Sequence, residues 1–531
     1  MVTLDSTQRK WNRRTEAWFL ALASLLFLIT RLWNVSLFPI FNDEGIYLQY
    51  SELIHDDFSA NKYVSVHNIY GDWKPPLQYW IGGLFISSKR DPLVAGRIVA
   101  SVFSLIGLFG TYFFVRQIFT PTAAAGAAAF YLISPLTLFY NTQFVAETFV
   151  FSTTAALYAC LAALLRSLER LRIAALMWFI ASVLSGALLV LFKQAGALPL
   201  YLSILLPFAF WTSWRAVAKS AAVVAAVILV SSILSAVAIP AQYSTNEAHF
   251  TAQWTMSVKE IAALPSAVWS ANAREILELY TRYYTVAMLA ALLLYAVWSF
   301  VRGTSNDLTV LALFLLSSAA IIFCLKQFNE YLYHTAIVVF MLAILGRLVS
   351  VTIESPGTPG IHRRMVAILP GILLLFIGVF WIYQCVLIKT DSVAYLRQAS
   401  TWAKENYLNG WPSGYGVKDV AQFLSSRAGT GLVILDPQWG NPRTSLEILR
   451  PLAYPNMRLF RMGDDILQRE SLLKRMDNAG IRENRFIIFS DWSPPGSVRD
   501  RWVPYVKANY CVNKRQFSDH PDQIPIVVCE F

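Results

Sequence analysis

Long uninterrupted apolar runs are the feature that most restricts what this chain can fold into. A helix of about 20 apolar residues crosses roughly 30 Å of hydrocarbon, and runs of about that length recur along the sequence. A backbone that crosses lipid must satisfy its own hydrogen bonds, so these runs predict membrane-spanning α-helices. About eleven spans are predicted, at residues 17–34, 95–116, 122–140, 144–165, 173–192, 196–212, 217–240, 283–301, 308–325, 333–350 and 365–388.

The composition supports a membrane protein. Of the 531 residues, 56% are hydrophobic and 15% are charged, whereas soluble domains carry about 25% charged residues. The net charge of +11 is typical either of a nucleic-acid-binding surface or of membrane loops whose cations set the orientation. The positions of the cations favour the second interpretation, and no nucleic acid is expected as a partner.

The orientation follows from the loop charges. Arg9, Lys10, Arg13 and Arg14 precede the first apolar run, and no cleavage pattern follows it, so the first helix is predicted to stay attached with its basic start in the cytoplasm. Most short-loop cations then fall on the cytoplasmic side, as the positive-inside bias requires. A multi-pass protein of the cell (inner or plasma) membrane is predicted, with its outward segments at residues 35–94, the turns near 141 and 193, residues 241–282, and everything after about 388.

The composition changes after residue 388. The segments "GLVILD", "NRFIIFSDW" and "IPIVVCEF" are short β-branched runs between polar and helix-patterned stretches, which predicts an α/β domain. The predicted domains are therefore a transmembrane domain at 1–388, with a catalytic first outer loop at 35–94, and an extracytoplasmic α/β domain at 389–531. Cys511 and Cys529 share this outer domain, where an oxidising compartment would allow them to form a disulfide. The sequence leaves open whether they pair or stay free.

Charges at the outer ends of the spans are candidates for a functional site, because ionisable groups in or beside a membrane are costly. Asp43 and Glu44 follow the first span, and Lys74 precedes two prolines in "YGDWKPPLQYW". Glu147 lies just inside the outer end of the fourth span, and Lys193 interrupts apolar sequence after the fifth. The outer end of span nine adds Lys326, Glu330, Tyr331 and His334.

Plainer explanations exist for most of these charges. Lysines at helix ends often extend their side chains to the membrane surface, and Glu330 has the helical i, i+4 spacing to pair with Lys326. His334 is explained equally well as a satisfied interfacial histidine and as a ligand. Asp43 and Glu44 suit the first turn of a helix. None of these explanations accounts for the gathering of the charges on one side of the membrane.

A transfer in which a hydroxyl or amine attacks a sugar C1 while a phosphate departs would use such a pattern. A carboxylate must orient or deprotonate the nucleophile, and cations must hold the phosphate, whose charge grows in the transition state. A phosphate carried on a long isoprenoid would be held at the membrane edge. Asp43 as the base and Lys74 and Lys193 as the cations meet these demands, and Pro75 and Pro76 give Lys74 a stiff entry into the next helix.

Five stretches, in order, resemble the polytopic glycosyltransferases of the C-type fold (GT-C). They are "NDEGIYLQY", "GDWKPPLQYWIGGLF", "DPLVAGRIVASVFSLIGLFGTYFFVRQIF", "FYNTQFVAETFVF" and "LLVLFKQAG". They are most similar to the bacterial branch that includes aminoarabinose transferases of lipid A and relatives of protein O-mannosyltransferases. The resemblance covers roughly residues 17–340 and implies a polyprenyl-phosphate sugar donor, an extracytoplasmic acceptor (lipid, glycan or protein) and inversion at C1.

The resemblance also implies roles for individual residues. Asp43 corresponds to the main catalytic carboxylate, Glu44 to its neighbour in the acidic motif, and Glu147 to a second acidic residue. Lys74 and Lys193 correspond to lysines beside the donor phosphate. From their position at the outer end of span nine, Tyr331 and His334 are added to the donor-phosphate group, and a structural role is expected for Arg97.

Metal dependence and rival functions stay open at this stage. Asp43, Glu147, His55, His67 and His334 carry possible ligand atoms for a divalent ion, but no spacing demands one, so no metal site is assigned. A transporter or lipid flippase predicts charges near the bilayer midplane and related half-chains, neither of which is visible. If the chain were a non-catalytic assembly factor, the energetic cost of placing Glu147 and Lys193 at the membrane edge would have no explanation.

Overall fold

The computed structural model describes residues 13–530 apart from 68–73, 88, 169–171, 240–251, 253, 329, 355–360, 411, 428–430, 436–441, 462–473, 475–476, 479–484 and 493–497. The described chain forms two compact units. Unit 1 comprises Met1–Trp33, Ala100–Thr142 and Ala146–Lys389, and unit 2 comprises Asn34–Val99, Gln143–Val145 and Thr390–Phe531. The first predicted outer loop therefore folds together with the carboxyl-terminal residues.

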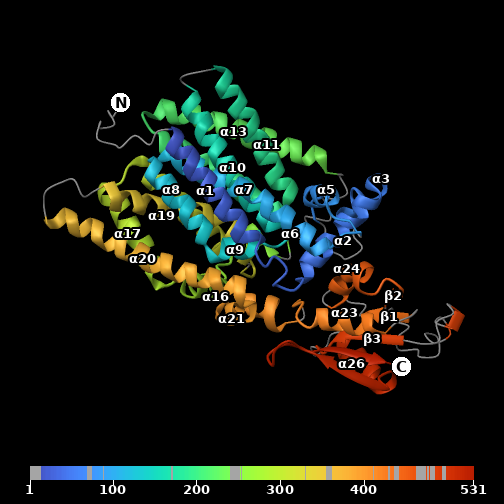
Figure 1. Ribbon diagram of the computed structural model, residues 1–531. Helices are drawn as coiled ribbons and strands as arrows, with labels where there is room; N and C mark the ends of the chain where they lie inside the picture. The colour runs from blue at the N-terminus through green and yellow to red at the C-terminus, as the bar shows by residue number, and fades with distance from the viewer. Residues whose placement is uncertain are drawn as a thin grey trace. The chain divides into compact units, whose positions relative to one another are not determined.

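Unit 1 is helical, and Figure 1 shows α7, α8 and α10 side by side in it. Within the described residues, eight helices are long and apolar enough to cross a membrane, and two bent helix pairs raise that number to at most ten. The helices of unit 1, with α6 entering from unit 2, are α1 (Arg13–Leu32), α6 (Pro92–Phe103), α7 (Leu105–Ile118), α8 (Pro121–Ile133), α9 (Pro135–Asn141), α10 (Ala146–Ser167), α11 (Arg172–Phe192), η1 (Gln194–Gly196), α12 (Ala197–Leu202), η2 (Ser203–Phe210), α13 (Trp214–Ala238), α15 (Val258–Ala262), α16 (Ser266–Leu279), η3 (Tyr280–Tyr284), α17 (Val286–Arg302), α18 (Ser305–Cys324), α19 (Glu330–Glu354) and α20 (Ile361–Thr390).

The helical membrane fold predicted from the sequence is confirmed, and three of the eleven predicted spans differ from single straight helices. The span predicted at 122–140 is α8 and α9, bent by 62° at Ser134, which precedes Pro135 and is extended because proline disfavours a helical residue before it. The span predicted at 283–301 joins a bent pair at Thr285, where φ is 70°. The span predicted at 196–212 is the short run from η1 to η2, with Pro207 inside it.

The bend after α8 leaves carbonyl groups that a buried arginine satisfies. The last carbonyls of a helix lack partners within it, and Arg31 of α1 donates from Nη1 to the carbonyl of Leu132 (2.7 Å) and from Nη2 to that of Tyr131 (3.2 Å). Lys389 of α20 in turn donates to the carbonyls of Arg31 (3.1 Å) and Trp33 (2.9 Å) at the end of α1. These two cations therefore brace helix ends.

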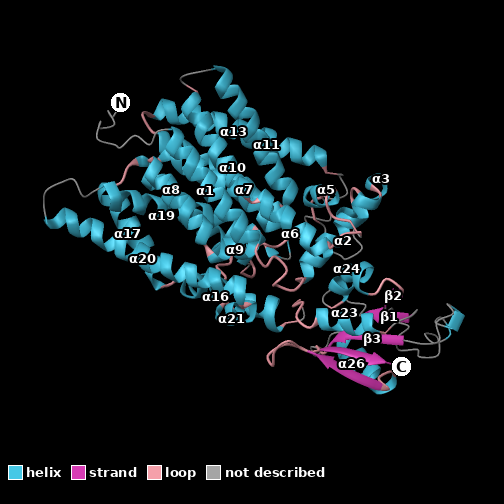
Figure 2. Cartoon of the chain, viewed as in Figure 1, coloured by secondary structure: helices cyan, strands magenta, loops and turns pink. Residues whose placement is uncertain are grey.

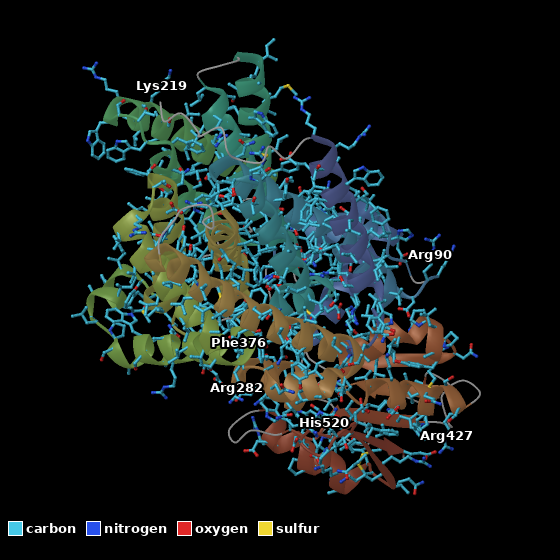
Figure 3. All side chains as sticks on the ribbon, turned by 60° about the vertical axis from the view of Figure 1, so that its left-hand side comes forward. Arg90, Lys219, Arg282, Phe376, Arg427 and His520 are labelled. Carbon is cyan, nitrogen blue, oxygen red and sulfur yellow. A yellow bond between two sulfur atoms is a disulfide. The ribbon has the colours of Figure 1, made fainter. Side chains whose placement is uncertain are left out.

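Apolar side chains cover the outside of the long helices. Phe376, labelled in Figure 3, lies on α20 and is 64% exposed, and neighbouring leucines and isoleucines on the same helix are exposed as well. An exposed apolar surface on a helix of this length is expected to face lipid, where it costs nothing.

Unit 2 begins with helices from the first predicted outer loop. They are α2 (Asn42–Asp56), α3 (Phe58–Asn61), α4 (Val64–His67) and α5 (Leu77–Gly83), followed by the start of α6. Tyr79 of α5 packs between Tyr47 and Tyr50 of α2, with ring centroids 5.5 and 5.2 Å away. Glycines allow α5 to approach closely, since a Cβ on Gly82 would lie 2.2 Å from the Ser51 hydroxyl.

The carboxyl-terminal part of unit 2 contains a five-stranded mixed sheet, drawn in magenta in Figure 2, with strand order β2-β1-β3-β5-β4. The parallel strands are β1 (Gly431–Leu435), β2 (Met457–Arg461) and β3 (Arg485–Ser490), and β4 (Asn513–Phe517) and β5 (Ile526–Glu530) add antiparallel. Its helices are α21 (Ser392–Gln398), α22 (Thr401–Ala403), η4 (Lys404–Asn409), α23 (Val417–Ser426), α24 (Arg443–Ala453) and α26 (Val498–Asn509).

The three strands predicted from sequence are β1, β3 and β5, and the two that were missed lie at the sheet edges. Edge strands are commonly charged, and "NKRQF" in β4 has almost no apolar content. A disulfide joins Cys511 to Cys529 of β5, which resolves the pairing that the sequence left open.

Candidate functional site

The acidic pair at 43 and 44 lies in the first turn of α2. Phe41 precedes the helix in an extended conformation and makes no side-chain cap, so the first amides of α2 lack a capping side chain at that position. Carboxylates in a first turn are stabilised by the partial positive charge of the helix N-terminus. Successive helical residues point about 100° apart, and the two carboxylates accordingly meet different partners.

Asp43 forms a polar cluster with Lys74 and Tyr47, which we call the Asp43 cluster. The Lys74 ammonium lies 3.4 Å from Asp43 Oδ2 and donates to the Tyr47 hydroxyl at 2.7 Å. The Tyr47 hydroxyl donates in turn to Asp43 Oδ2 at 3.4 Å, and the ammonium also lies 4.4 Å from the centroid of the Tyr47 ring. The side chain of Asp43 is 32% exposed and that of Lys74 is 13% exposed, so the carboxylate remains accessible.

The backbone around Lys74 fixes the direction of its side chain. The Lys74 amide donates to the carbonyl of Ser65 (3.3 Å), and two prolines follow before α5 begins at Leu77. Proline restricts both its own φ and the residue before it. The stiff entry predicted from the "KPP" sequence therefore holds Lys74 against α2.

Glu44 belongs to a second cluster, the Glu44 cluster, which also contains Arg97 and Phe144. Arg97 donates from Nε to Glu44 Oε1 (2.8 Å) and from Nη2 to Oε2 (2.6 Å), a bidentate pair. The backbone amide of Phe144 adds a third donor to Oε1 at 2.9 Å. Glu44 is 0% exposed and the Arg97 side chain 1% exposed, and Arg97 also donates to the carbonyls of Val35, Phe38 and Pro39.

Unit 1 brings Glu147 and Lys193 together. Glu147 lies in the first turn of α10 and is almost fully buried, and Lys193 lies between α11 and η1. The Lys193 ammonium forms an ion pair with Glu147 Oε1. A buried carboxylate requires such a partner, so the lysine does more here than extend to the membrane surface.

The ion pair between Lys326 and Glu330 that the i, i+4 spacing suggested does not form, and Glu330 is instead part of a buried polar group. Lys326 pairs with Glu260 (2.9 Å), not with Glu330, because Lys326 lies in a loop before α19 begins. Glu330 is buried and accepts from the Tyr140 hydroxyl at 3.0 Å. His334 is buried between the rings of Tyr140 and Phe151. The side chain of Tyr331 lies outside the described residues.

The possible metal ligands do not gather within the described part of the chain. No group of three His, Cys, Asp or Glu side chains there is arranged to hold an ion. The Nδ1 atom of His55 lies 2.8 Å from the carbonyl of Gly83 instead, and the side chain of His67 is outside the described residues.

Sequence reasoning missed three polar residues that lie around Asp43 or hold its neighbours. Tyr47 is one helical turn after Asp43, an i, i+4 spacing that could have identified it once α2 was recognised as a helix. Asn42 donates from Nδ2 to Asp43 Oδ1 at 3.3 Å. Thr444, about 400 residues away in sequence, donates to Asn42 Oδ1 at 3.3 Å, and no sequence signal pointed to it.

Comparisons with known proteins agree with the resemblance predicted from the sequence. The profile of a family described as dolichyl-phosphate-mannose-protein mannosyltransferase (PMT_2) matches residues 73–239. No curated protein sequence matches the chain.

Solved structures match over most of the chain. ArnT from Cupriavidus metallidurans bound to undecaprenyl phosphate matches with a TM-score of 0.56 and 14% identity, covering 96% of this chain and 97% of ArnT. The Archaeoglobus fulgidus oligosaccharyltransferase tethered with an acceptor peptide matches with a TM-score of 0.51 and 12% identity, covering 90% and 69%. The same organism's AglB with an inhibitory peptide and a dolichol-phosphate gives 0.50 and 13%, covering 90% and 69%. At these identities the likeness is one of fold.

Proposed function

We propose, from the premise that this chain has the C-type (GT-C) glycosyltransferase fold, that it is an integral-membrane enzyme transferring a sugar from a polyprenyl-phosphate donor. The acceptor would be an extracytoplasmic lipid, glycan or protein. The observation that carries the proposal is the Asp43 cluster, in which an accessible carboxylate lies beside a lysine and a tyrosine hydroxyl. The donor class is supported by the solved structures of similar fold that hold undecaprenyl phosphate and a dolichol-phosphate.

The proposed step is a displacement at the sugar C1. The acceptor oxygen or nitrogen forms a bond to C1 from one face while the C1–O bond to phosphate breaks on the other, which inverts the configuration. The phosphate leaves with the bonding electron pair as polyprenyl phosphate, and the proton of the acceptor passes to Asp43. A general base contributes about 10²- to 10⁴-fold when it is positioned for the proton it takes.

Lys74 is suited to bind Asp43 before the donor arrives and the donor phosphate during the transfer. Without donor, its ammonium neutralises Asp43 across 3.4 Å, a long contact for an ion pair. A donor phosphate carries more charge than one carboxylate oxygen, so it would attract the ammonium and leave Asp43 free to accept a proton. Tyr47 accepts a hydrogen bond from the ammonium and donates one to the carboxylate, which keeps the two groups in reach of each other.

Glu44 suits a positioning role better than proton transfer. Both of its oxygens are already occupied by charged and amide donors, and none of its surface is exposed. Three donors already hold this carboxylate, and an acceptor molecule has no exposed surface through which to reach it. We assign Glu44 and Arg97 to fixing the start of α2, and Asp43 to the chemistry.

The polar residues of unit 1 take the roles implied by the family resemblance. Lys193 would supply a second cation for the lipid phosphate, with Glu147 as its counter-ion in the absence of donor. His334 and Tyr331, in the first turns of α19, are proposed to line the donor site. Replacing Lys193 by Met tests this assignment, since donor affinity should fall while the affinity for an acceptor stays unchanged.

The protein is proposed to lie in the cell membrane with α2 and the carboxyl-terminal sheet outside the cytoplasm. The disulfide between Cys511 and Cys529 supports this orientation, because structural disulfides persist in oxidising compartments. The distribution of short-loop cations predicted the same sidedness. Cysteine labelling at exposed Val512 in intact cells tests the orientation, since only an extracytoplasmic thiol reacts with an impermeant reagent.

The test of the catalytic assignment is Asp43→Asn in the purified full chain. Release of polyprenyl phosphate is measured with a panel of polyprenyl-phosphate hexoses and pentoses and candidate acceptors in detergent. Asp43→Asn should reduce turnover by at least about a hundredfold with an unchanged melting temperature. Asp56→Asn, an exposed carboxylate at the other end of α2, is the matched control, and native turnover by Asp43→Asn would refute the assignment.

The same assay separates the enzyme from a flippase. A flippase moves its lipid across the bilayer and leaves the sugar–phosphate bond intact, so it releases no polyprenyl phosphate in detergent. The charges described in unit 1 also lie at helix ends, as Glu147 and Lys193 do, rather than at mid-helix, where a transport site is expected.

A further inference from the structure

We propose that the carboxyl-terminal α/β part of the chain positions the catalytic carboxylate, and that Thr444 on α24 orients Asp43 through the side chain of Asn42. This inference rests on the proposed function of Asp43. The juxtaposition lies within unit 2, and Figure 1 shows α24 beside α2.

Close packing brings the amino-terminal end of α24 against α2. A Cβ on Gly45 would lie 3.0 Å from Thr444 Cβ and 3.1 Å from its hydroxyl, so a glycine at this position of α2 permits the approach. Gln49, one turn further along α2, donates from Nε2 to Glu447 Oε2 at 2.6 Å. The two helices are therefore joined along two turns by contacts of both shape and charge.

The segment before α2 is held by the same region. The Asn42 amide donates to the carbonyl of Pro412 at 3.1 Å, and the Ser445 hydroxyl donates to the carbonyl of Ile40 at 3.2 Å. The carboxyl-terminal residues thus contact the backbone on both sides of Phe41, where α2 starts. A shift of α24 would move the first turn of α2, which carries Asp43.

Hydrogen-bond polarity gives Thr444 a specific effect on Asp43. The Thr444 hydroxyl donates to Asn42 Oδ1 at 3.3 Å, which leaves the Asn42 Nδ2 to donate to Asp43 Oδ1 at 3.3 Å. An amide that turned over would place its oxygen toward the carboxylate instead, exchanging a donor for a repulsive acceptor. The Asp43 carboxylate only accepts, so it determines which end of the Asn42 amide faces it, and the Thr444 hydroxyl holds the amide in that position by donating to its oxygen.

The two oxygens of the Asp43 carboxylate therefore face different hydrogen-bond donors on different sides. Oδ1 faces the donor from Asn42, whereas Oδ2 faces Lys74 and Tyr47. A carboxylate fixed through one oxygen keeps the other in a defined direction, which a general base requires. Thr444 is a positioning residue in this scheme, since it touches Asn42 and not the reacting atoms.

The experiment compares Thr444→Val with Thr444→Ser in the purified full chain, by release of polyprenyl phosphate from the donor that the wild type uses. Val keeps the shape and removes the hydroxyl, and Ser keeps the hydroxyl. Thr444→Val should lower kcat about fivefold, the effect of one hydrogen bond between neutral groups, and leave the donor KM within about twofold. The acidic limb of its pH–rate profile should move to higher pH, because Asn42 is no longer held by Thr444 and donates less well to the carboxylate.

Two comparisons keep the outcome interpretable. Thr444→Ser should keep the native kcat and pH profile, and Ser445→Ala, which removes a hydrogen bond between the same segments outside the relay, should lower kcat less than Thr444→Val and leave the pH profile unchanged. Asn42→Ala should lower kcat at least as much as Thr444→Val, and the double variant should lose no more than Asn42→Ala, because both break one relay. Native kcat in Thr444→Val, or losses that add in the double variant, would overturn the inference even while Asp43→Asn is inactive.

A measurement without catalysis separates this inference from the proposed function. Hydrogen exchange of the amides of residues 42–50 should quicken in Thr444→Val and not in Thr444→Ser. If the wild type releases no polyprenyl phosphate but exchange responds in this way, the proposed function fails and the hold of α24 on α2 stands. Unchanged exchange in Thr444→Val would show that Thr444 does not hold α24 against α2. Because exchange needs no turnover, this measurement can also be made on a variant that is too unstable for the activity assay.

Discussion

Asp43 and Glu44 are adjacent in sequence and lie in opposite environments. The Asp43 cluster is partly open to solvent, contains a lysine, and holds its carboxylate through contacts of 3.3–3.4 Å. The Glu44 cluster is closed, contains an arginine, and saturates its carboxylate through contacts of 2.6–2.9 Å. The difference suggests a division of labour, because arginine suits a fixed bidentate pair and lysine suits a cation that changes partners.

The largest expected effect is the loss of stability when the closed cluster is broken. Arg97→Met leaves the Glu44 carboxylate buried without its charged partner, and removing one member of a buried ion pair costs about 3–5 kcal/mol. The free energy of unfolding should fall by about that amount, seen as a lower midpoint in thermal unfolding of the full chain in detergent.

The matched control for Arg97→Met is Lys74→Met. Its partner, Asp43, is 32% exposed and can be hydrated, so the melting temperature should fall much less. Equal losses in the two variants would show that the two clusters do not differ as described.

The next largest effect concerns Glu52, a third carboxylate of α2. Burial, and then the neighbouring Asp56, raise the pKa of Glu52 from 4.5 to about 7, and Arg450 only partly opposes the shift. A raised carboxyl pKa means that the folded chain keeps a proton that the unfolded chain releases. The contribution of Glu52 to the free energy of unfolding should therefore be highest below pH 4.5, fall as the pH rises toward 7, and level off above it.

The size of this fall can be bounded and measured. At about 1.4 kcal/mol per pH unit, the shift corresponds to at most about 3 kcal/mol. Glu52→Gln should remove that share of the pH dependence and raise the melting temperature at pH 8. Asp522→Asn, which changes a carboxylate that is 57% exposed, should leave the pH dependence as it is. A Glu52→Gln chain with the native pH dependence would contradict the burial described for Glu52.

The open cluster predicts an effect on donor binding. Lys74→Met removes a charge-assisted partner of the donor phosphate, worth about 1.5–3 kcal/mol, so the donor Kd should rise by about one to two orders of magnitude. Donor binding is measured with the polyprenyl-phosphate sugar and, separately, with polyprenyl phosphate alone. Lys74→Arg keeps the charge and should retain part of the affinity. Unchanged affinity in Lys74→Met would place the phosphate elsewhere.

The contrast between the clusters also shows what the sequence could and could not predict. Apolar run length located the long helices, because membrane thickness imposes it locally, but the bends at Ser134 and Thr285 depended on single residues inside those runs. The residues Asp43, Glu44, Lys74, Glu147 and Lys193 were identified because charges at membrane edges are costly. Which carboxylate meets which cation was not predictable, since Glu44 finds Arg97 and Asp43 finds Lys74 only through the packing of α5 and α6 on α2.

Contacts that join distant segments were the least accessible from sequence. Thr444 reaches Asn42 across about 400 residues, and nothing in "PRTSLEILRPL" distinguishes it from an ordinary helix start. The edge strand β4 was missed because its sequence, "NKRQF", is polar and carries no hydrophobic signal, whereas β2, "MRLFR", was missed although three of its five residues are apolar. The catalytic roles assigned to these residues remain predictions for the variants to test.

Tyr47→Phe is expected to give the smallest effect and is the finest test of the open cluster. The hydroxyl accepts from Lys74 at 2.7 Å and donates to Asp43 at 3.4 Å, whereas the ring holds the ammonium at 4.4 Å. Phe keeps the ring and its attraction for the cation, so donor affinity should change little. Both hydrogen bonds of the hydroxyl run to charged groups, and at this partly exposed site their loss corresponds to about 1.5 kcal/mol, the lower end of the range for such bonds, so kcat should fall about tenfold.

The matched control for Tyr47→Phe is Tyr50→Phe on the same helix. Both rings pack on Tyr79, but only the Tyr47 hydroxyl belongs to the Asp43 cluster. If the hydroxyl aligns Lys74 with Asp43, kcat falls in Tyr47→Phe alone, and the deficit shrinks when Lys74 is already replaced, since the two residues then share one interaction. A similar loss in Tyr50→Phe, or a deficit that persists beside Lys74→Met, would mean that the hydroxyl acts through the packing of α2 and not through the lysine.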